Sequence, residues 1–88
     1  MDRAIQSVIE ERGRQNEKWG EQRHNWVEWI AILGEEFGES SQAAVEAHWS
    51  GGETPRKERH LREEMVQVAA VAVQIIEHLD ERLDYYES

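Results

Sequence analysis

The chain has 88 residues, which is room for one domain with a thin hydrophobic core. Nineteen Asp and Glu against ten Lys and Arg give a formal net charge of -9, which disfavours direct binding to nucleic acid or to an anionic membrane surface. Cysteine is absent, which excludes a disulfide framework, a thiolate zinc site and a cysteine nucleophile.

Hydropathy adds two expectations. Only 39% of the residues are hydrophobic, so we expect the chain to share apolar surface with a second copy of itself. No apolar run approaches the ~18–20 residues of a membrane span, and residues 1–10 lack the apolar region of a signal peptide. We therefore expect a cytoplasmic protein that does not enter a membrane.

The first predicted element is a helix over residues 2–15. Ile5, Val8 and Ile9 stand at i, i+3 and i+4, and Asp2 is the expected N-cap. The helical periodicity is then lost, so residues 18–25 are expected to form a loop.

A second helix is predicted over residues 26–48. Asn25 precedes it, and Glu28 stands three residues further on, which is the spacing of a capping box. The stripe that we expect this helix to bury consists of Trp26, Ile30, Leu33, Phe37 and Ala44.

The third predicted helix covers residues 55–83, with Thr54 as its N-cap and Pro55 at its first position. Its apolar residues between Leu61 and Leu83 form a face that is too wide for packing against one other helix. Residues 84–88 are expected to fray.

These elements predict an all-α fold in which the two long helices lie antiparallel, because the connector between them is short. The short N-terminal helix packs beside them. The wide face of the third helix predicts a four-helix-bundle core that is completed in a homodimer or a homotetramer.

Glutamates are concentrated at one point of each long helix. Glu35, Glu36 and Glu39 occupy one turn of the second helix, and Glu63 and Glu64 occupy one turn of the third. In an antiparallel hairpin these turns can face each other, so that three to five carboxylates converge across a groove. An all-oxygen cluster suits Mg²⁺ or Mn²⁺. The alternative is an acidic, solvated helix face that binds no ion.

Two glycines, Gly34 and Gly38, lie four residues apart among these glutamates, where each lowers helix stability by about 1 kcal/mol relative to Ala. They leave space either for the phosphates of a ligand or for a tight crossing with another helix.

A nucleotide needs a stacking surface and cations for its phosphates, and the segment before the second helix offers both. Trp19 and His24 are the candidate contacts for the base, with a hydrophobic plug as the alternative for Trp19 and a surface or hydrogen-bonding loop residue as the alternative for His24. The candidate cations are Arg12, Arg14, Lys18 and Arg23.

The sequence Glu35-Glu36-Phe37-Gly38-Glu39, followed on the next helix by Glu64, resembles the EExxE…ExxD signature of the all-α nucleoside triphosphate pyrophosphohydrolases. That superfamily includes MazG, the dCTP pyrophosphatases and the dimeric dUTPases. Residues 17–24 and 61–71 resemble the pre-helix segment and the second acidic helix of small MazG-like proteins, which are often encoded by phages or prophages. The resemblance covers about residues 10–79.

The resemblance implies hydrolysis of a (deoxy)nucleoside triphosphate to its monophosphate and pyrophosphate, with Mg²⁺ as the cofactor. By position, Glu36, Glu39 and Glu64 match metal ligands of the family, and Glu35 or Glu36 would position or deprotonate the attacking water. Lys18, Trp19, Arg23 and His24 lie in or next to the region that contacts the nucleotide.

Gln67 departs from the signature, because it stands where the family has an Asp ligand. An amide offers one neutral oxygen, so the expected metal site has one negative charge fewer. Two other hypotheses therefore stay open. One is a nucleotide-binding or regulatory bundle whose catalysis has weakened, and the other is an acidic interaction protein such as a nucleic-acid mimic.

Overall fold

The computed structural model describes all 88 residues, Met1–Ser88, and contains three helices and no strand. In chain order these are α1 (Asp2–Trp19), α2 (Trp26–Trp49) and α3 (Pro55–Glu87). The all-α prediction is confirmed. None of the three helices is both long enough and apolar enough to cross a membrane.

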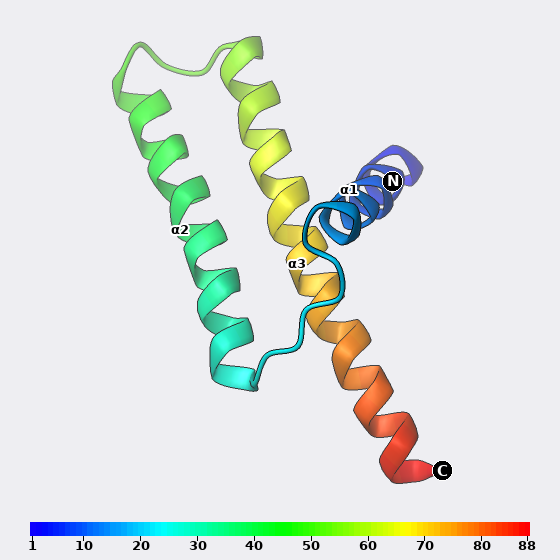
Figure 1. Ribbon diagram of the computed structural model, residues 1–88. Helices are drawn as coiled ribbons and strands as arrows, with labels where there is room; N and C mark the ends of the chain where they lie inside the picture. The colour runs from blue at the N-terminus through cyan, green and yellow to red at the C-terminus, as the bar shows by residue number, and fades with distance from the viewer.

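α3 is the central element of the fold. α2 lies antiparallel along one side of it, and α1 crosses it on the other side, as Figure 1 shows. α1 and α2 do not pack against each other. The last turns of α3 continue past the point where α2 begins, which helps to make the molecule elongated, with extents of 54 × 28 × 23 Å.

The starts of the two long helices follow from local hydrogen bonding. The Asn25 side chain accepts a hydrogen bond from the Glu28 amide (2.8 Å), and the Glu28 carboxylate accepts one from the Asn25 amide (3.0 Å), which completes the predicted capping box. Thr54 Oγ1 likewise accepts from the Lys57 amide (3.3 Å), directly before Pro55. An N-cap of this kind contributes about 1 kcal/mol to helix stability.

Two glycines form the turn between α2 and α3, and hydrogen bonds from a lysine stabilise it. Gly51 and Gly52 have φ angles of 109° and 86°, a backbone region that other residues rarely adopt. Lys57 Nζ donates to the carbonyl oxygens of Ser50 (3.1 Å) and Gly52 (3.2 Å). These contacts tie the end of α2 to the start of α3 and so fix the antiparallel hairpin.

The first helix begins at Asp2, as predicted, but its expected N-cap and C-terminal end are wrong. The N-cap is Met1 rather than Asp2, and α1 continues to Trp19 instead of ending at residue 15. Lys18 and Trp19 are therefore helical. Polar residues can extend a helix without apolar periodicity, and α1 stops only at Gly20, where φ is 69°.

The other two helices are also longer than predicted. α2 ends at Trp49, one residue beyond the predicted end, and α3 continues to Glu87, so residues 84–87 are helical rather than frayed.

The expected buried stripe of α2 is wrong in part. Trp29 and Ser40 are the buried residues of this helix, and of the predicted stripe Leu33 and Ala44 are half-buried. Trp26, Ile30 and Phe37 are exposed. Successive helical residues differ by about 100°, so the exposed three lie on a face next to the one that contacts α3. The apolar residues of α2 are thus divided between two faces, although the sequence pattern combined them into one.

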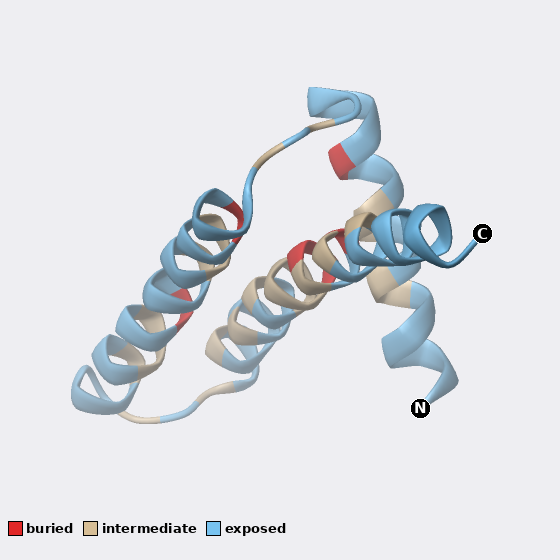
Figure 2. Cartoon of the chain, turned by 90° about the horizontal axis from the view of Figure 1, so that it is seen from below, coloured by how far each residue is buried: buried red, intermediate tan, exposed pale blue.

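The core is thin, as expected for this length. Only three apolar residues are buried, namely Trp29 of α2 and Ala70 and Val71 of α3. Figure 2 shows buried residues as short segments on helices that are otherwise exposed or half-buried. Most of the chain is exposed or half-buried.

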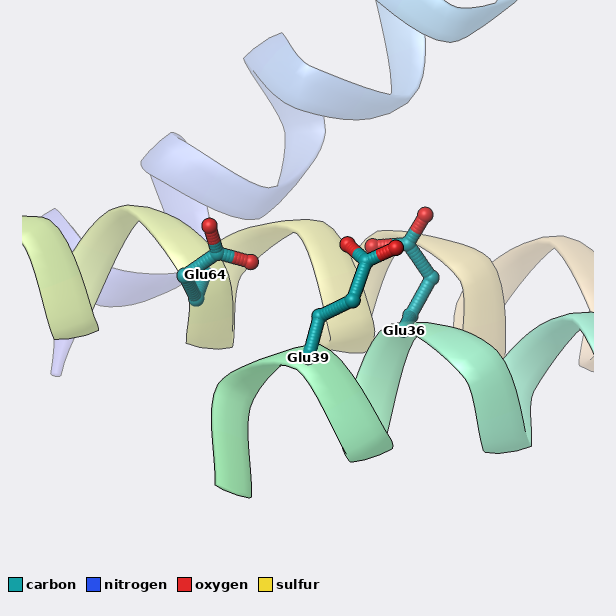
Figure 3. Close-up of side chains that lie close together, drawn as sticks. All are labelled: Glu36, Glu39 and Glu64. Carbon is teal, nitrogen blue, oxygen red and sulfur yellow. The ribbon is translucent and has the colours of Figure 1, made fainter. Parts of the chain in front are cut away.

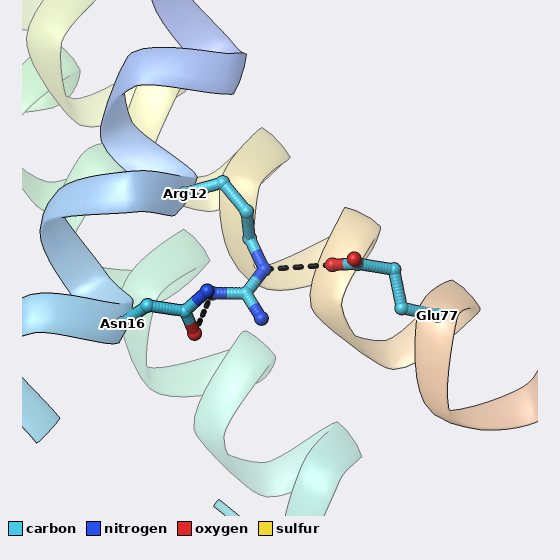
Figure 4. A network of polar contacts seen from close by, with 3 residues as sticks. All are labelled: Arg12, Asn16 and Glu77. Carbon is cyan, nitrogen blue, oxygen red and sulfur yellow. Dashed lines mark hydrogen bonds and ion pairs between the residues drawn. The ribbon is translucent and has the colours of Figure 1, made fainter. Parts of the chain in front are cut away.

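α1 is attached to α3 by long polar side chains. Arg12 Nε donates to a carboxylate oxygen of Glu77 (2.8 Å) while its Nη1 donates to Asn16 Oδ1 (2.8 Å), as drawn in Figure 4. Further along α1, Ser7 Oγ accepts a hydrogen bond from Arg62 (2.8 Å). Gln15 is the buried residue of α1.

Candidate metal centre

Two helices bring three of the predicted carboxylates together. Glu36 and Glu39 stand one turn apart on α2, and Glu64 comes from α3. One carboxylate oxygen from each residue lies within 4.8 Å of the others. Figure 3 shows the three side chains converging between the two helices, on the side where α1 crosses. The antiparallel hairpin produces this convergence because it sets the middle of α2 opposite the first half of α3.

The electrostatics of the cluster are unfavourable when the carboxylates are ionised. Burial raises the pKa of the Glu36 carboxyl above its ordinary value, and the nearby charges of Glu39, Glu64, Glu11 and Glu35 raise that pKa further. No Lys or Arg forms an ion pair with any of the three clustered carboxylates. The repulsion in the cluster is therefore not compensated by side chains of this chain.

Two oxygens of the cluster are also unsatisfied. Glu36 Oε2 and Glu64 Oε2 are buried and accept no hydrogen bond. The nearest basic group to Glu64 is His60 Nε2, which lies 3.6 Å from its other oxygen, Oε1, and belongs to an exposed ring. Leaving a buried polar group without a partner costs about 1–3 kcal/mol, so two such oxygens in one cluster indicate a missing partner.

A hard divalent cation fits these oxygens chemically. Mg²⁺ binds oxygen ligands at 2.0–2.1 Å, so opposite ligands on one ion lie about 4.2 Å apart. Three oxygens within 4.8 Å of one another reach such an ion after only small side-chain movements. One ion held by these oxygens would offset the repulsion among the three carboxylates.

Glu11 on α1 is a member of this environment that the sequence interpretation missed. Its side chain is only 16% exposed, accepts from Arg14 Nε (2.9 Å), and its charge contributes to the raised pKa of Glu36. The available signal was its position three residues after Val8, on the edge of α1 already expected to be buried. Glu11 approaches Glu36 only because α1 packs on α3, which is a tertiary contact.

The remaining predicted acids do not join the cluster. Glu35 and Glu63 are exposed, so three carboxylates converge rather than five. Gln67 is half-buried, lies one turn after Glu64 on α3 and makes no side-chain hydrogen bond. Its amide is therefore not committed to another partner.

The candidate nucleotide contacts are not gathered at the cluster. Lys18 Nζ lies 4.8 Å from the centroid of the Trp19 ring, so these two residues pair with each other at the exposed end of α1. Arg23 forms an ion pair with Glu21 (2.8 Å) in the following loop. Of the other candidate cations, Arg12 and Arg14 are paired with Glu77 and Glu11.

His24 anchors the loop before α2. Its Nε2 lies 3.2 Å from Gln22 Oε1, and its ring packs edge-on against buried Trp29, with a centroid distance of 4.8 Å. Trp29 in turn contacts His78 of α3 (4.9 Å between centroids). This arrangement agrees with the alternative in which His24 is a hydrogen-bonding loop residue.

The two internal glycines of α2 have open surroundings. A Cβ atom built at Gly34 or Gly38 meets no neighbouring atom within 4 Å. Neither glycine therefore serves a tight helix crossing within one chain. Both lie on the side of α2 away from α3.

A comparison with protein-family models, curated proteins and solved structures found no match to this chain. The fold and the site together define this protein as an all-α chain with a three-carboxylate candidate metal centre.

Replacing Glu36 by Gln should stabilise the metal-free protein at neutral pH by about 1 kcal/mol, because the change removes a buried charge and supplies an amide donor near the unpaired Glu64 oxygen. The raised pKa means that the folded chain keeps the Glu36 proton to higher pH than the unfolded chain. The free energy of unfolding therefore falls as pH rises from the ordinary value of 4.5 through the raised pKa.

Urea denaturation in the presence of a chelator, repeated between pH 4 and pH 8, measures both effects. Glu36→Gln should flatten the fall in stability across that range. The exposed Glu63→Gln change is the control, and it should leave the profile as in the wild type. If the free energy of unfolding of Glu36→Gln depended on pH as that of the wild type does, the electrostatic description of the cluster would be contradicted.

Proposed function

We propose that this chain is a Mg²⁺- or Mn²⁺-dependent hydrolase that converts a (deoxy)nucleoside triphosphate to its monophosphate and pyrophosphate. The observation that carries the proposal is the convergence of Glu36, Glu39 and Glu64, two of which have buried oxygens without partners. The EExxE pattern that contains two of them resembles that of the MazG-like pyrophosphohydrolases. We place the activity in nucleotide-pool housekeeping or in phage nucleotide metabolism.

In this proposal Glu36, Glu39 and Glu64 hold the ion, and the Gln67 amide oxygen is a weak fourth ligand. A bound divalent cation would neutralise the phosphate charge that develops as the bond between the α- and β-phosphates breaks. Glu35 is the exposed carboxylate next to Glu36 and forms no ion pair, so it is free to orient the attacking water or to accept its proton.

The nucleotide contacts in the proposal come from the end of α1 and the loop that follows. Trp19 is half exposed and offers a stacking surface, with Lys18 beside it. Arg23 and His24 complete the proposed set. Because Arg23 is held by Glu21 in this structure, a triphosphate has to displace that carboxylate in order to use the guanidinium.

We further propose that the protein acts in the cytoplasm as a homodimer or a homotetramer and binds neither a membrane nor nucleic acid directly. The thin core supports self-association, because three buried apolar residues are few for a chain of 88. The charge of -9 argues against phosphate-backbone partners.

A nucleotide-binding or regulatory bundle is the second candidate function. It is favoured by the neutral Gln67, which leaves the proposed metal site with one negative charge fewer than the signature has. In that case the carboxylates still bind an ion and the nucleotide still binds, but turnover is slow or absent. An acidic interaction protein requires its acids to be spread over an exposed face, and the clustered Glu36 and Glu64 do not fit that description.

Incubation with the eight common nucleoside and deoxynucleoside triphosphates, with Mg²⁺ or Mn²⁺ present, tests the proposal. We expect at least one nucleotide to yield its monophosphate and pyrophosphate, resolved by anion-exchange chromatography. Glu39→Gln is the matched inactive variant, because it removes a ligand charge at an exposed position with little change of shape.

Absence of monophosphate with every nucleotide and both ions would contradict the hydrolase. Calorimetric binding of a nucleotide under those conditions would then support the regulatory bundle instead.

A further inference from the structure

A fourth glutamate, Glu11, lies on the stretch of α1 that polar contacts attach to α3. Arg62 of α3 donates to Ser7 Oγ (2.8 Å), four residues before Glu11. Arg12, the next residue after Glu11, pairs with Glu77 of α3 (2.8 Å). Figure 3 shows the oxygens of the clustered carboxylates on the side of the hairpin that α1 crosses. These contacts therefore hold the middle of α1 beside the candidate metal centre.

The charge of Glu11 affects the cluster more than that of a neighbour in sequence. Burial and the charges of Glu39 and Glu64 are the largest causes of the raised pKa of Glu36, and Glu11 follows them, ahead of Glu35. Interactions between charges weaken with distance, and Glu35 adjoins Glu36 in the chain. Glu11 is therefore close to the cluster in space, although it belongs to a different helix.

Glu11 has little compensation for its own charge. Its side chain is only 16% exposed, and its ion pair with Arg14 (2.9 Å) engages only Oε1. The Arg14 side chain is 61% exposed, so solvent screens this pair. A half-buried carboxylate beside like charges is unfavourable unless a cation or a hydrogen-bond donor compensates it. Oε2 of Glu11 is available to accept from such a donor.

Glu11 lies outside the set of candidate metal ligands. The residues whose oxygens are within 4.8 Å of one another are Glu36, Glu39 and Glu64 alone. Mg²⁺ is octahedral and keeps several waters, so three carboxylate oxygens leave about three positions for water. Carboxylates next to a ligand set accept hydrogen bonds from it and fix its geometry. The position of Glu11 suits this outer role.

We propose that Glu11 accepts a hydrogen bond from a water molecule in the coordination shell of the ion held by Glu36, Glu39 and Glu64, so that ion binding tightens the packing of α1 on α3. The inference rests on the metal centre of the proposed function and adds a positioning residue from the third helix. A divalent ion offsets two of the three carboxylate charges that repel Glu11, and the water supplies the donor that Oε2 lacks.

The packing of α1 also concerns the proposed nucleotide contacts. Lys18 and Trp19 belong to the last turn of α1, about two turns after Glu11. Tighter packing of α1 on α3 therefore fixes where both side chains stand. An ion at the carboxylate cluster prepares the distant end of α1 for a nucleotide in this way.

Hydrogen exchange followed by mass spectrometry, with saturating Mg²⁺ or NaCl at matched ionic strength, tests the proposal. In the wild type, Mg²⁺ should slow exchange of the α1 amides by about tenfold. In Glu11→Gln this slowing should fall below about twofold, while amides of the α2–α3 hairpin still respond to the ion. Glu10→Gln is the matched control, because Glu10 is the neighbouring, exposed glutamate, and it should respond as the wild type does.

A purely structural role of Glu11 gives a different result. Loss of the ion pair with Arg14 would speed exchange of α1 equally with and without Mg²⁺. Arg14→Gln removes the same pair but keeps Glu11, so it should retain the slowing by Mg²⁺. Equal slowing in Glu11→Gln and the wild type would overturn the proposal, and so would loss of the slowing in Arg14→Gln or Glu10→Gln.

Calorimetric titration of Mg²⁺ separates this inference from the proposed function. Removing an outer partner of a metal site weakens binding, so Glu11→Gln should bind Mg²⁺ about tenfold more weakly than the wild type and Glu10→Gln. Wild-type affinity in Glu11→Gln would overturn the role of Glu11 and leave the metal centre in place. Absence of Mg²⁺ binding by the wild type would overturn the metal centre and this inference together.

Discussion

Magnesium at 100 times its dissociation constant is expected to raise the midpoint of thermal unfolding by about 10–20 °C. A ligand that binds only the folded state adds about 2.7 kcal/mol at that concentration. In a domain of this size each kcal/mol shifts the midpoint by about 4–8 °C. The physical source is the relief of repulsion among Glu36, Glu39 and Glu64, together with new partners for two buried oxygens.

Differential scanning calorimetry with MgCl₂, MnCl₂ and NaCl at matched ionic strength measures this effect. Sodium screens surface charge on the whole chain, which carries -9, so some rise with NaCl is expected. The rise with Mg²⁺ or Mn²⁺ should exceed it clearly. Equal rises in all three salts would mean that the glutamates form a solvated acidic face without a specific ion.

Glu39→Gln is expected to weaken Mg²⁺ and Mn²⁺ binding by more than about 100-fold, because one of only three charged ligands becomes neutral. Gln67→Asp is expected to act in the opposite direction and tighten binding by about tenfold, since a carboxylate holds a hard cation better than an amide does. Gln67 is suited to this role because it lies one turn from Glu64 and its amide has no other partner.

Isothermal titration of metal into the wild type and both variants measures these affinities. Turnover in Gln67→Asp need not follow affinity, because tighter ground-state binding raises the rate only if it also favours the transition state. Should Gln67 instead contribute to helix packing, Gln67→Asp should lower the unfolding midpoint and leave the affinity unchanged. Wild-type affinity in both variants would show that the ion does not bind at this cluster.

The fold was predictable from sequence wherever local chemistry determines it. Asn25 with Glu28, and Thr54 with Pro55, specify the two long helices to within a residue at their starts, because a cap acts over three or four residues. The end of α1 was not predictable from apolar spacing, since the turn that carries Lys18 is helical without contacting a core.

The candidate site was also predictable from sequence only in part. Glu36 and Glu39 could be paired from their spacing, and the short connector placed Glu64 opposite them. Glu11 could not be assigned, because its approach to Glu36 depends on how α1 crosses α3. The apolar residues of α2 were assigned to one stripe because hydrophobic spacing does not distinguish a face that packs within the chain from one that is left exposed.

The central position of α3 makes α1 and α2 two separate partners of the same helix. α1 touches α3 but not α2, and the capping box and the Lys57 contacts that define the hairpin do not involve α1. α1 can therefore detach as a separate unit, at a free-energy cost set by its contacts with α3 rather than by global unfolding. Because Glu11 leaves with it, each detachment also reduces the negative potential at Glu36, so the electrostatics of the cluster are coupled to the docking of α1 on α3.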